Sequence, residues 1–149
     1  MFVSEISSPI GRVWLCSDTE AVTGLYFTRR EGEWGDALPL HREAAKQLGE
    51  YFSGERREFD LPLHPTGTPF QLAVWQALRT IPYGETRSYG QIAAAVENPK
   101  ASRAVGMANN HNPISIIIPC HRVIGSTGKL VGYGGGLAVK RALLELEKG

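Results

Sequence analysis

A short segment rich in proline and glycine, HPTGTP at residues 64–69, divides the 149-residue chain into parts with different hydrophobic patterns. Before it, apolar and polar residues alternate over short runs, which is typical of strands. After it, apolar residues recur at the three- and four-residue spacing of helices. We therefore expect an α+β fold with two small domains, an N-terminal one at residues 1–65 and a mostly helical one at residues 66–149.

The first part predicts a small antiparallel sheet with one helix. Turns at SSPIG and DTE separate three expected strands, FVSEI at 2–6, RVWLCS at 12–17 and AVTGLYF at 21–27. The polar segment at 28–39 is expected to be a loop. Apolar residues at helical spacing predict a helix over Leu40–Phe52, which Gly54 ends. The run REFDLPL at 57–63 is a candidate for a last strand.

Four helices are expected in the second part. Their expected starts are Thr68 followed by Pro69, Ser88, Asn98 followed by Pro99, and Leu137. The helix from Ser88 to about Val96 and the helix from Asn98 are joined by the short break ENP, as in a helix-turn-helix. An ordinary helical hairpin has the same pattern, so the pattern alone does not decide between the two structures. The closing helix is expected to run from Leu137 to Lys148.

One of the two cysteines, Cys120, has a neighbour that suggests chemistry. It follows the branched apolar run ISIII at 114–118, which predicts a buried strand, and Pro119; His121 comes next. Neighbours in an extended chain point to opposite sides, so the two side chains need not touch, but a water could bridge them if the chain turns after Pro119. A histidine that takes the thiol proton would make a thiolate available. A small buried hydrophobe is the alternative, and is our interpretation of Cys16.

A carboxylate on the apolar side of the closing helix is a second candidate. Glu147 follows Leu143 by four positions and Leu144 by three, whereas Glu145 is rotated toward solvent. A carboxylate on an apolar face needs a partner, and a histidine partner would gain a fixed tautomer and higher basicity. A frayed and exposed Glu147 is the alternative, since only two residues follow.

The charges are distributed unevenly, although the net charge is only +1. Residues 1–65 hold 7 Lys/Arg and 11 Asp/Glu, while residues 66–149 hold 9 and 4, so the second part is the one suited to a polyanion. No cysteine and histidine cluster has zinc-site spacing. The sequence has neither signal-peptide features nor a run of about 20 apolar residues, so we expect an intracellular, cytoplasmic protein that does not enter membranes.

Together these motifs resemble the O6-alkylguanine-DNA alkyltransferases, or methylated-DNA–protein-cysteine methyltransferases. The similar stretches are IPYGETRSYGQIA at 81–93, NPKASRAVGMANNHNPISIIIPCHRVIG at 98–125 and GYGGGLAVKRALLELE at 132–147. They cover nearly all of residues 69–149. The first 65 residues match in general layout, which in this family is a ribonuclease H-like sheet with a helix.

The resemblance implies a role for each matching residue of the reaction centre. Cys120 would accept the alkyl group, His121 would act as its water-mediated base, and Glu147 would orient that histidine. Tyr89 would stand beside the phosphate 3′ to the target nucleotide, help its rotation and be a candidate proton donor. Asn112 would join the helix-turn-helix to the active-site strand.

The resemblance also implies a DNA-binding surface and a base pocket. Arg103, on the recognition helix, would fill the space left by a flipped nucleotide. Small residues would permit close approach to the minor groove: Ala101, Ala104 and Ala108. The base pocket would include Tyr133, Val123 and Gly134. The family commonly has serine or alanine at the last position, but the backbone N–H would be the donor to guanine O6, so glycine can serve.

The implied function is direct, single-turnover repair of O6-alkylguanine, and of O4-alkylthymine, in double-stranded DNA. The protein would need no cofactor and no metal, and would be a monomer in solution. Two alternatives come from other classes: a lesion sensor or regulator with a redox-active cysteine, and a cysteine hydrolase that uses Cys120 and His121. Relatives that bind lesions without repairing them have tryptophan in place of the reactive cysteine. Cys120 therefore argues against that class of protein.

Overall fold

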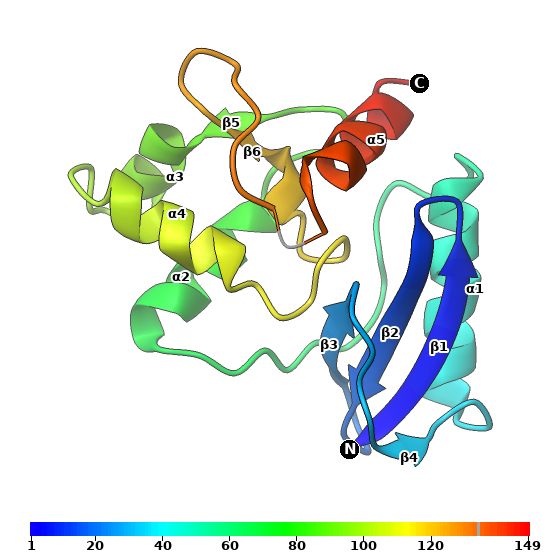
Figure 1. Cartoon of the computed structure of the whole chain (residues 1–149). Coiled ribbons are helices and arrows are strands. Elements are labelled where there is room, and N and C mark those ends of the chain that lie inside the picture. Colours follow the sequence, from blue (N-terminus) through cyan, green and yellow to red (C-terminus); the bar gives the residue numbers. More distant parts are fainter. Residues whose placement is uncertain (134) are drawn as a thin grey trace. The chain divides into compact units, whose positions relative to one another are not determined.

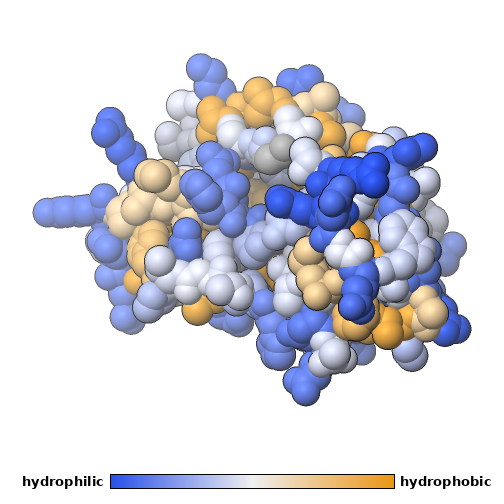
Figure 2. Space-filling model, turned by 60° about the horizontal axis from the view of Figure 1, so that its bottom comes forward, coloured by the Kyte–Doolittle hydropathy of each residue, from blue (hydrophilic) through white to orange (hydrophobic). Residues whose placement is uncertain are grey.

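The structure is a computed structural model that describes residues 1–133 and 135–149. It divides into two compact units, Met1–Pro65 and Thr66–Gly149. The expected α+β fold is confirmed, with most strands in the first unit and most helices in the second (Figure 1). On the face drawn in Figure 2, hydrophobic residues form small patches among hydrophilic ones. No helix in the described part of the chain is long and apolar enough to span a membrane.

The first unit contains a sheet of the strands β1 (Phe2–Ser8), β2 (Gly11–Ser17), β3 (Val22–Tyr26) and β4 (Glu33–Trp34). Their order across the sheet is β3-β2-β1-β4. The three expected strands are confirmed, and β1, β2 and β3 pair antiparallel. The fourth, β4, pairs parallel with β1 inside the segment expected to be a loop. A strand of two residues, such as β4, is too short to show the alternating pattern by which strands are predicted. The candidate strand at 57–63 forms only an isolated bridge, from Leu63 to Val22.

One helix, α1 (Pro39–Phe52), lies along one face of this sheet (Figure 1). Its apolar side chains Ala44, Leu48 and Tyr51 are buried. His41 is buried on the same helix, with one ring nitrogen 2.7 Å from the Ser4 hydroxyl and the other 2.6 Å from the Ser17 hydroxyl. Both polar atoms of a buried imidazole therefore have partners on β1 and β2, as burial requires.

The second unit is built from α2 (Pro69–Leu78), α3 (Tyr89–Ala95), α4 (Ser102–Asn110) and α5 (Leu137–Lys148). The expected caps of the first two are confirmed as reciprocal capping boxes. In one, the Thr68 hydroxyl accepts from the Gln71 N–H at 3.1 Å while the Gln71 side chain accepts from the Thr68 N–H at 2.9 Å. Helices α2, α3 and α4 pack against one another, with α3 and α4 forming a helix-turn-helix (Figure 1).

The start of α4 differs from the sequence prediction, which placed the cap at Asn98 and Pro99 in the first turn. Residues 98–101 instead form a turn closed by a hydrogen bond from the Ala101 N–H to the Asn98 carbonyl, 2.9 Å, and the helix starts at Ser102. Asparagine followed by proline is favoured in the first two positions of a β-turn as well as at a helix start. The dipeptide therefore does not distinguish the two.

The predicted strand at 114–118 is wrong. These residues form a buried, tightly bonded turn, in which the Ile118 N–H donates to the Ile114 carbonyl at 3.0 Å and Ile116 has a φ of 71°. A short apolar run indicates burial but not conformation. The nearby strand pairing lies on the other side of Cys120, where β6 (Val123–Ile124) pairs parallel with β5 (Arg87–Ser88).

Candidate active site

Cys120 lies in a turn that follows the buried segment 114–118. Its side chain is buried, with 3% of the residue exposed, and the chain turns at once through a short 3₁₀ helix, η1 (Cys120–Arg122). The Cys120 N–H donates to the Ile118 carbonyl at 2.8 Å. Its own carbonyl accepts from Nδ2 of Asn109 on α4, at 3.3 Å. The backbone on both sides of the sulfur is therefore fixed by hydrogen bonds.

Two asparagines connect the helix-turn-helix to this turn. Nδ2 of Asn112 donates to the Ile118 carbonyl at 2.8 Å, and its Oδ1 accepts from the Ile114 N–H at 3.0 Å. Asn112 thus joins the end of α4 to the turn before Cys120. Asn109 has a similar role that the sequence analysis missed, although a signal was present. It follows Val105 by four positions, on the buried side of α4, where an amide needs partners.

The environment of the thiol decides its resting protonation state. Burial raises the pKa of the Cys120 thiol above its usual value. A hydrogen bond from Asn112 and the charge of Lys140 oppose burial, with smaller contributions from the Cys120 backbone and Ser115, but they do not cancel it. The resting side chain is therefore a thiol, and a nucleophilic reaction at this sulfur needs a base.

A suitable base is the next residue. His121 is fully buried, and its Nε2 lies 2.6 Å from Oε2 of Glu147 in the last turn of α5. Burial lowers the pKa of His121, and Glu147 opposes this. The neutral imidazole therefore donates its Nε2–H to the carboxylate and has its lone pair on Nδ1. Nδ1 is buried and has no hydrogen-bond partner among the described residues, so it is the ring atom able to take a proton.

Arg122 contacts the same carboxylate and was not among the residues predicted for the site. Its Nε donates to Oε1 of Glu147 at 2.7 Å and its Nη2 donates to Oε2 at 3.0 Å. Its Nη1 donates to the Ile81 carbonyl at 2.8 Å. A signal was available, because Arg122 stands beside His121 in the same motif and a buried glutamate needs a cation.

A cavity of about 560 Å³ lies beside α3 and α4, and Tyr89 and Arg103 are among the residues that line it. Burial raises the pKa of the Tyr89 phenol, and Cys120 adds to that effect. Its hydroxyl donates to the Val131 carbonyl at 3.1 Å, and Nζ of the buried Lys140 donates to the same carbonyl at 2.8 Å. The other residues around the cavity are Ser88, Gly90, Ser102, Gly106, Met107, Asn110, Ser126, Val131 and Gly132.

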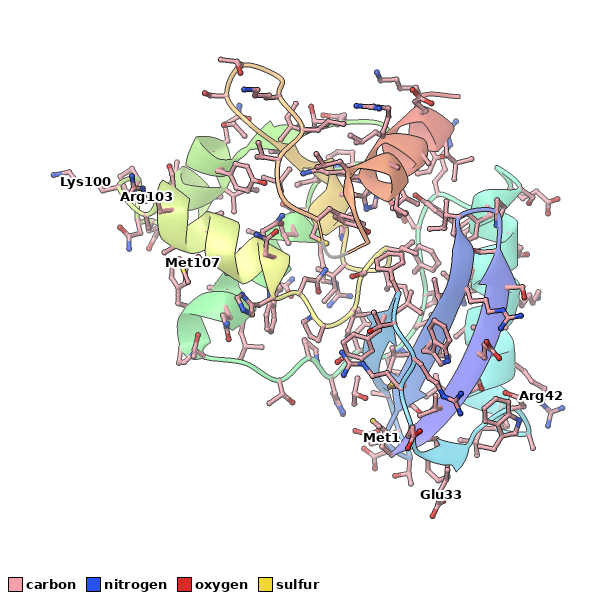
Figure 3. All side chains as sticks on the ribbon, in the orientation of Figure 1. Met1, Glu33, Arg42, Lys100, Arg103 and Met107 are labelled. Atoms are coloured by element: carbon pink, nitrogen blue, oxygen red, sulfur yellow. The ribbon has the colours of Figure 1, made fainter. Side chains whose placement is uncertain are left out.

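The outer side of α4 carries exposed side chains. Figure 3 shows Arg103 and Met107 there and Lys100 in the turn before the helix, and all three are exposed. Ala104 is exposed beside them and Ala101 is half-buried. Ala108, expected at the same surface, is buried instead, and its carbonyl accepts from Nε1 of Trp75 on α2 at 2.8 Å. The side chain of Ala108 therefore belongs to the core.

The residues predicted for a base pocket follow Cys120 in the chain. Val123 is buried in β6, and Tyr133 is half-buried. Gly134 lies outside the described residues. Gly132 has a φ of 55°, a left-handed conformation that favours glycine, and a Cβ there would lie 2.8 Å from Oδ1 of the exposed Asn110. Among residues 1–133 and 135–149, no group of three or more His, Cys, Asp or Glu could hold a metal ion.

Comparison with known proteins identifies the family. Residues 69–149 match the family model of the 6-O-methylguanine DNA methyltransferase DNA-binding domain, and residues 1–65 match the model of its ribonuclease-like domain. The chain belongs to this family. The resemblance drawn from the sequence motifs is thereby confirmed, and the chain is an enzyme of the methylated-DNA–protein-cysteine methyltransferase class.

Similar relatives cover nearly the whole chain. The methylated-DNA–protein-cysteine methyltransferase of Methanosarcina acetivorans is 51% identical over 153 residues, which are 99% of this chain and 98% of the relative. That of Mycobacterium bovis is 54% identical over 148 residues, 96% and 90% of the two chains. The crystal structure of Mycobacterium tuberculosis OGT in complex with DNA is 52% identical, with a TM-score of 0.91, and covers 99% of this chain and 93% of its own.

Proposed function

We propose that this chain repairs O6-alkylguanine in double-stranded DNA by transferring the alkyl group to the sulfur of Cys120. The observation that carries the proposal is the buried Cys120 thiol, which is followed by a histidine held 2.6 Å from Glu147 and lies in the segment after the helix-turn-helix. The structure of the M. tuberculosis relative with DNA supports DNA as the partner. We also propose that the protein acts inside the cell as a monomer.

The transfer begins with removal of the thiol proton. Neutral His121 takes the proton at Nδ1 through a bridging water, and Glu147 stabilises the resulting imidazolium across 2.6 Å. The Cys120 thiolate then attacks the alkyl carbon, so that an S–C bond forms as the C–O6 bond breaks. The electron pair of the broken bond leaves with guanine, which gains a proton. Burial raises the pKa of Tyr89, so its phenol stays protonated and is a candidate donor.

The product explains why one molecule would act once. S-alkylcysteine is a thioether, and a thioether sulfur attached to an alkyl group is a poor leaving group for water or a second nucleophile. O4-alkylthymine has the same alkyl–oxygen bond, and we propose it as a second substrate.

The target base must leave the stack to reach a buried sulfur, at a cost of a few kcal/mol. We propose that α4 docks in the minor groove, where its exposed Ala104 permits close approach and Arg103 occupies the place of the flipped nucleotide. Tyr89, in the cavity beside Arg103, would contact the neighbouring phosphate. Tyr133, Val123 and Gly134 would form the base pocket.

Intact mass spectrometry after incubation with duplex DNA containing O6-methylguanine tests the proposal. The protein should gain about 14 Da, one methyl in place of one hydrogen, on the peptide with Cys120. Cys120→Ser should gain nothing and still bind the duplex. A redox sensor would instead stay unmethylated and gain about 16 Da under peroxide, which would overturn the repair function.

A further inference from the structure

We infer that Arg122 is a positioning residue of this reaction. It orients the Glu147 carboxylate and keeps it ionised, and it thereby favours the neutral form of His121 that accepts the thiol proton. The inference rests on the proposed function of Cys120. Arg122 is not proposed to contact the thiol or the substrate itself. It acts through the carboxylate that it shares with the base.

The contacts around Glu147 are unequal. Arg122 reaches both carboxylate oxygens, Oε1 through Nε at 2.7 Å and Oε2 through Nη2 at 3.0 Å. His121 reaches only Oε2, and the Gly84 N–H approaches Oε1 at a weak 3.4 Å. A guanidinium that donates two parallel bonds fixes the plane of a carboxylate, which a single donor cannot do. Arg122 therefore decides where Oε2 lies for the imidazole.

The guanidinium is itself held in place from other directions. Its Nη1 donates to the Ile81 carbonyl at 2.8 Å, and its central carbon lies 5.7 Å from the centre of the Tyr83 ring. The Tyr83 hydroxyl donates in turn to the Leu146 carbonyl, beside Glu147, at 3.4 Å. The side chain of Arg122 is 9% exposed and that of Glu147 is 1% exposed. The segment after α2 and helix α5 thus fix the position of the Arg122 guanidinium.

Charge gives Arg122 a second effect. The charged groups that influence His121 are Glu147, which raises its pKa, and Arg122 and Lys140, which lower it. The titratable thiol of Cys120 precedes it in the chain. Without the guanidinium, the buried histidine–carboxylate pair would hold a proton more tightly, because one opposing positive charge is gone. A smaller fraction of the protein would then have neutral His121 beside ionised Glu147, which is the form that accepts the thiol proton.

The pH dependence of transfer separates this role from a structural one. We would measure single-turnover rates with free O6-benzylguanine from pH about 5 to about 9 for the whole protein and three variants. For Arg122→Met, the rise of the rate with pH should move to higher pH, with a loss of at least about tenfold at pH about 6 and a smaller loss at pH about 8.5. Arg122→Lys keeps the charge and loses the fork, so its profile should stay in place at a lower rate.

Arg141→Met is the matched control, because Arg141 is an exposed arginine on the same helix as Glu147. It removes one positive charge from α5 without touching the carboxylate and should behave as the unmodified protein. An equal loss for Arg122→Met at every pH would overturn the inference. An Arg122→Lys variant as fast as the unmodified protein would also overturn it, and this second variant decides the matter if Arg122→Met does not fold.

Ring ¹⁵N chemical shifts of His121 provide a readout that needs no activity. The unmodified protein should show the neutral Nε2–H tautomer, and Arg122→Met should protonate at higher pH. If the unmodified protein transfers no alkyl group, the proposed function fails while the ring shifts still test Arg122. If it transfers normally and the ring titrates identically in both proteins, only the role of Arg122 fails.

Discussion

Nε2 of His121 lies 2.6 Å from Oε2 of Glu147, although 26 positions separate the two residues in the chain. The contact joins the turn that contains Cys120 to the last turn of α5, and both side chains are buried. A base next to the thiol therefore depends on the docking of the C-terminal helix. Changes near the end of the chain should affect chemistry at the sulfur.

Glu147→Gln should slow alkyl transfer strongly. The amide keeps the shape of the side chain but cannot stabilise an imidazolium, so we expect a loss of about a hundredfold in the single-turnover rate with free O6-benzylguanine. Glu145→Gln on the exposed side of α5 is the control and should be silent. A Glu147→Gln protein that reacts at the unmodified rate would show that His121 works without its carboxylate.

Asn112→Ala should destabilise the protein and stop transfer together. The change removes three hydrogen bonds to the 114–118 turn: one to the Ile118 carbonyl, a weaker one to the Ile114 carbonyl, and one from the Ile114 N–H. Leaving buried backbone groups unpaired costs about 2–3 kcal/mol, measurable by denaturant unfolding. Asn98→Ala, at an exposed turn position, serves as the control. Normal stability with normal activity in Asn112→Ala would contradict the proposed connection.

The stability of the first unit should fall in acid because of His41. Burial lowers the pKa of His41 from 6.5, with partial opposition from Asp36. The unfolded chain therefore binds a proton below about pH 6.5 that the folded unit resists, so this stability is present above that pH and is lost as pH falls toward the folded value. The unfolding free energy should drop more between pH about 7.5 and 5 than in His41→Gln. An equal fall of the unfolding free energy with pH in the unmodified protein and in His41→Gln would disprove the prediction. His64→Gln, at an exposed histidine, is the control.

Arg103→Ala should separate base flipping from chemistry. If Arg103 stabilises the flipped state, its loss should slow repair at saturating duplex about a hundredfold, which corresponds to about 3 kcal/mol, and leave attack on free O6-benzylguanine unchanged. Lys100→Ala removes a neighbouring exposed cation and should only weaken binding in a salt-dependent way. Equal losses on both substrates would assign Arg103 a structural role.

The parts of the fold that depend on local chemistry were predictable. Thr68 and Ser88 start their helices because a hydroxyl, an amide three positions later and an apolar face all agree. Asn98 misled because asparagine before proline suits a turn equally well. The run at 114–118 showed burial but not its conformation, which depends on the Asn112 side chain and on the positive φ of Ile116.

The candidate site was predictable where motif and periodicity coincide. The position of Glu147 on the apolar side of α5 followed from its spacing to Leu143 and Leu144, and a histidine partner was a chemical expectation. The partners of Arg122 could not be predicted, because all three of its hydrogen bonds are with the segment after α2 and with α5, far away in the chain. Long-range polar contacts of this kind leave no periodic trace.

A titration with damaged DNA shows how many methyl groups one protein molecule accepts, and on which residue. The protein would be incubated with increasing duplex containing O6-methylguanine, and methyl groups per molecule would be counted by intact mass with peptide mapping. We expect a plateau at about one methyl, on Cys120, however much DNA is added. Methyl on any other residue, continued turnover beyond about one equivalent, or demethylated DNA with unmodified Cys120 would contradict it.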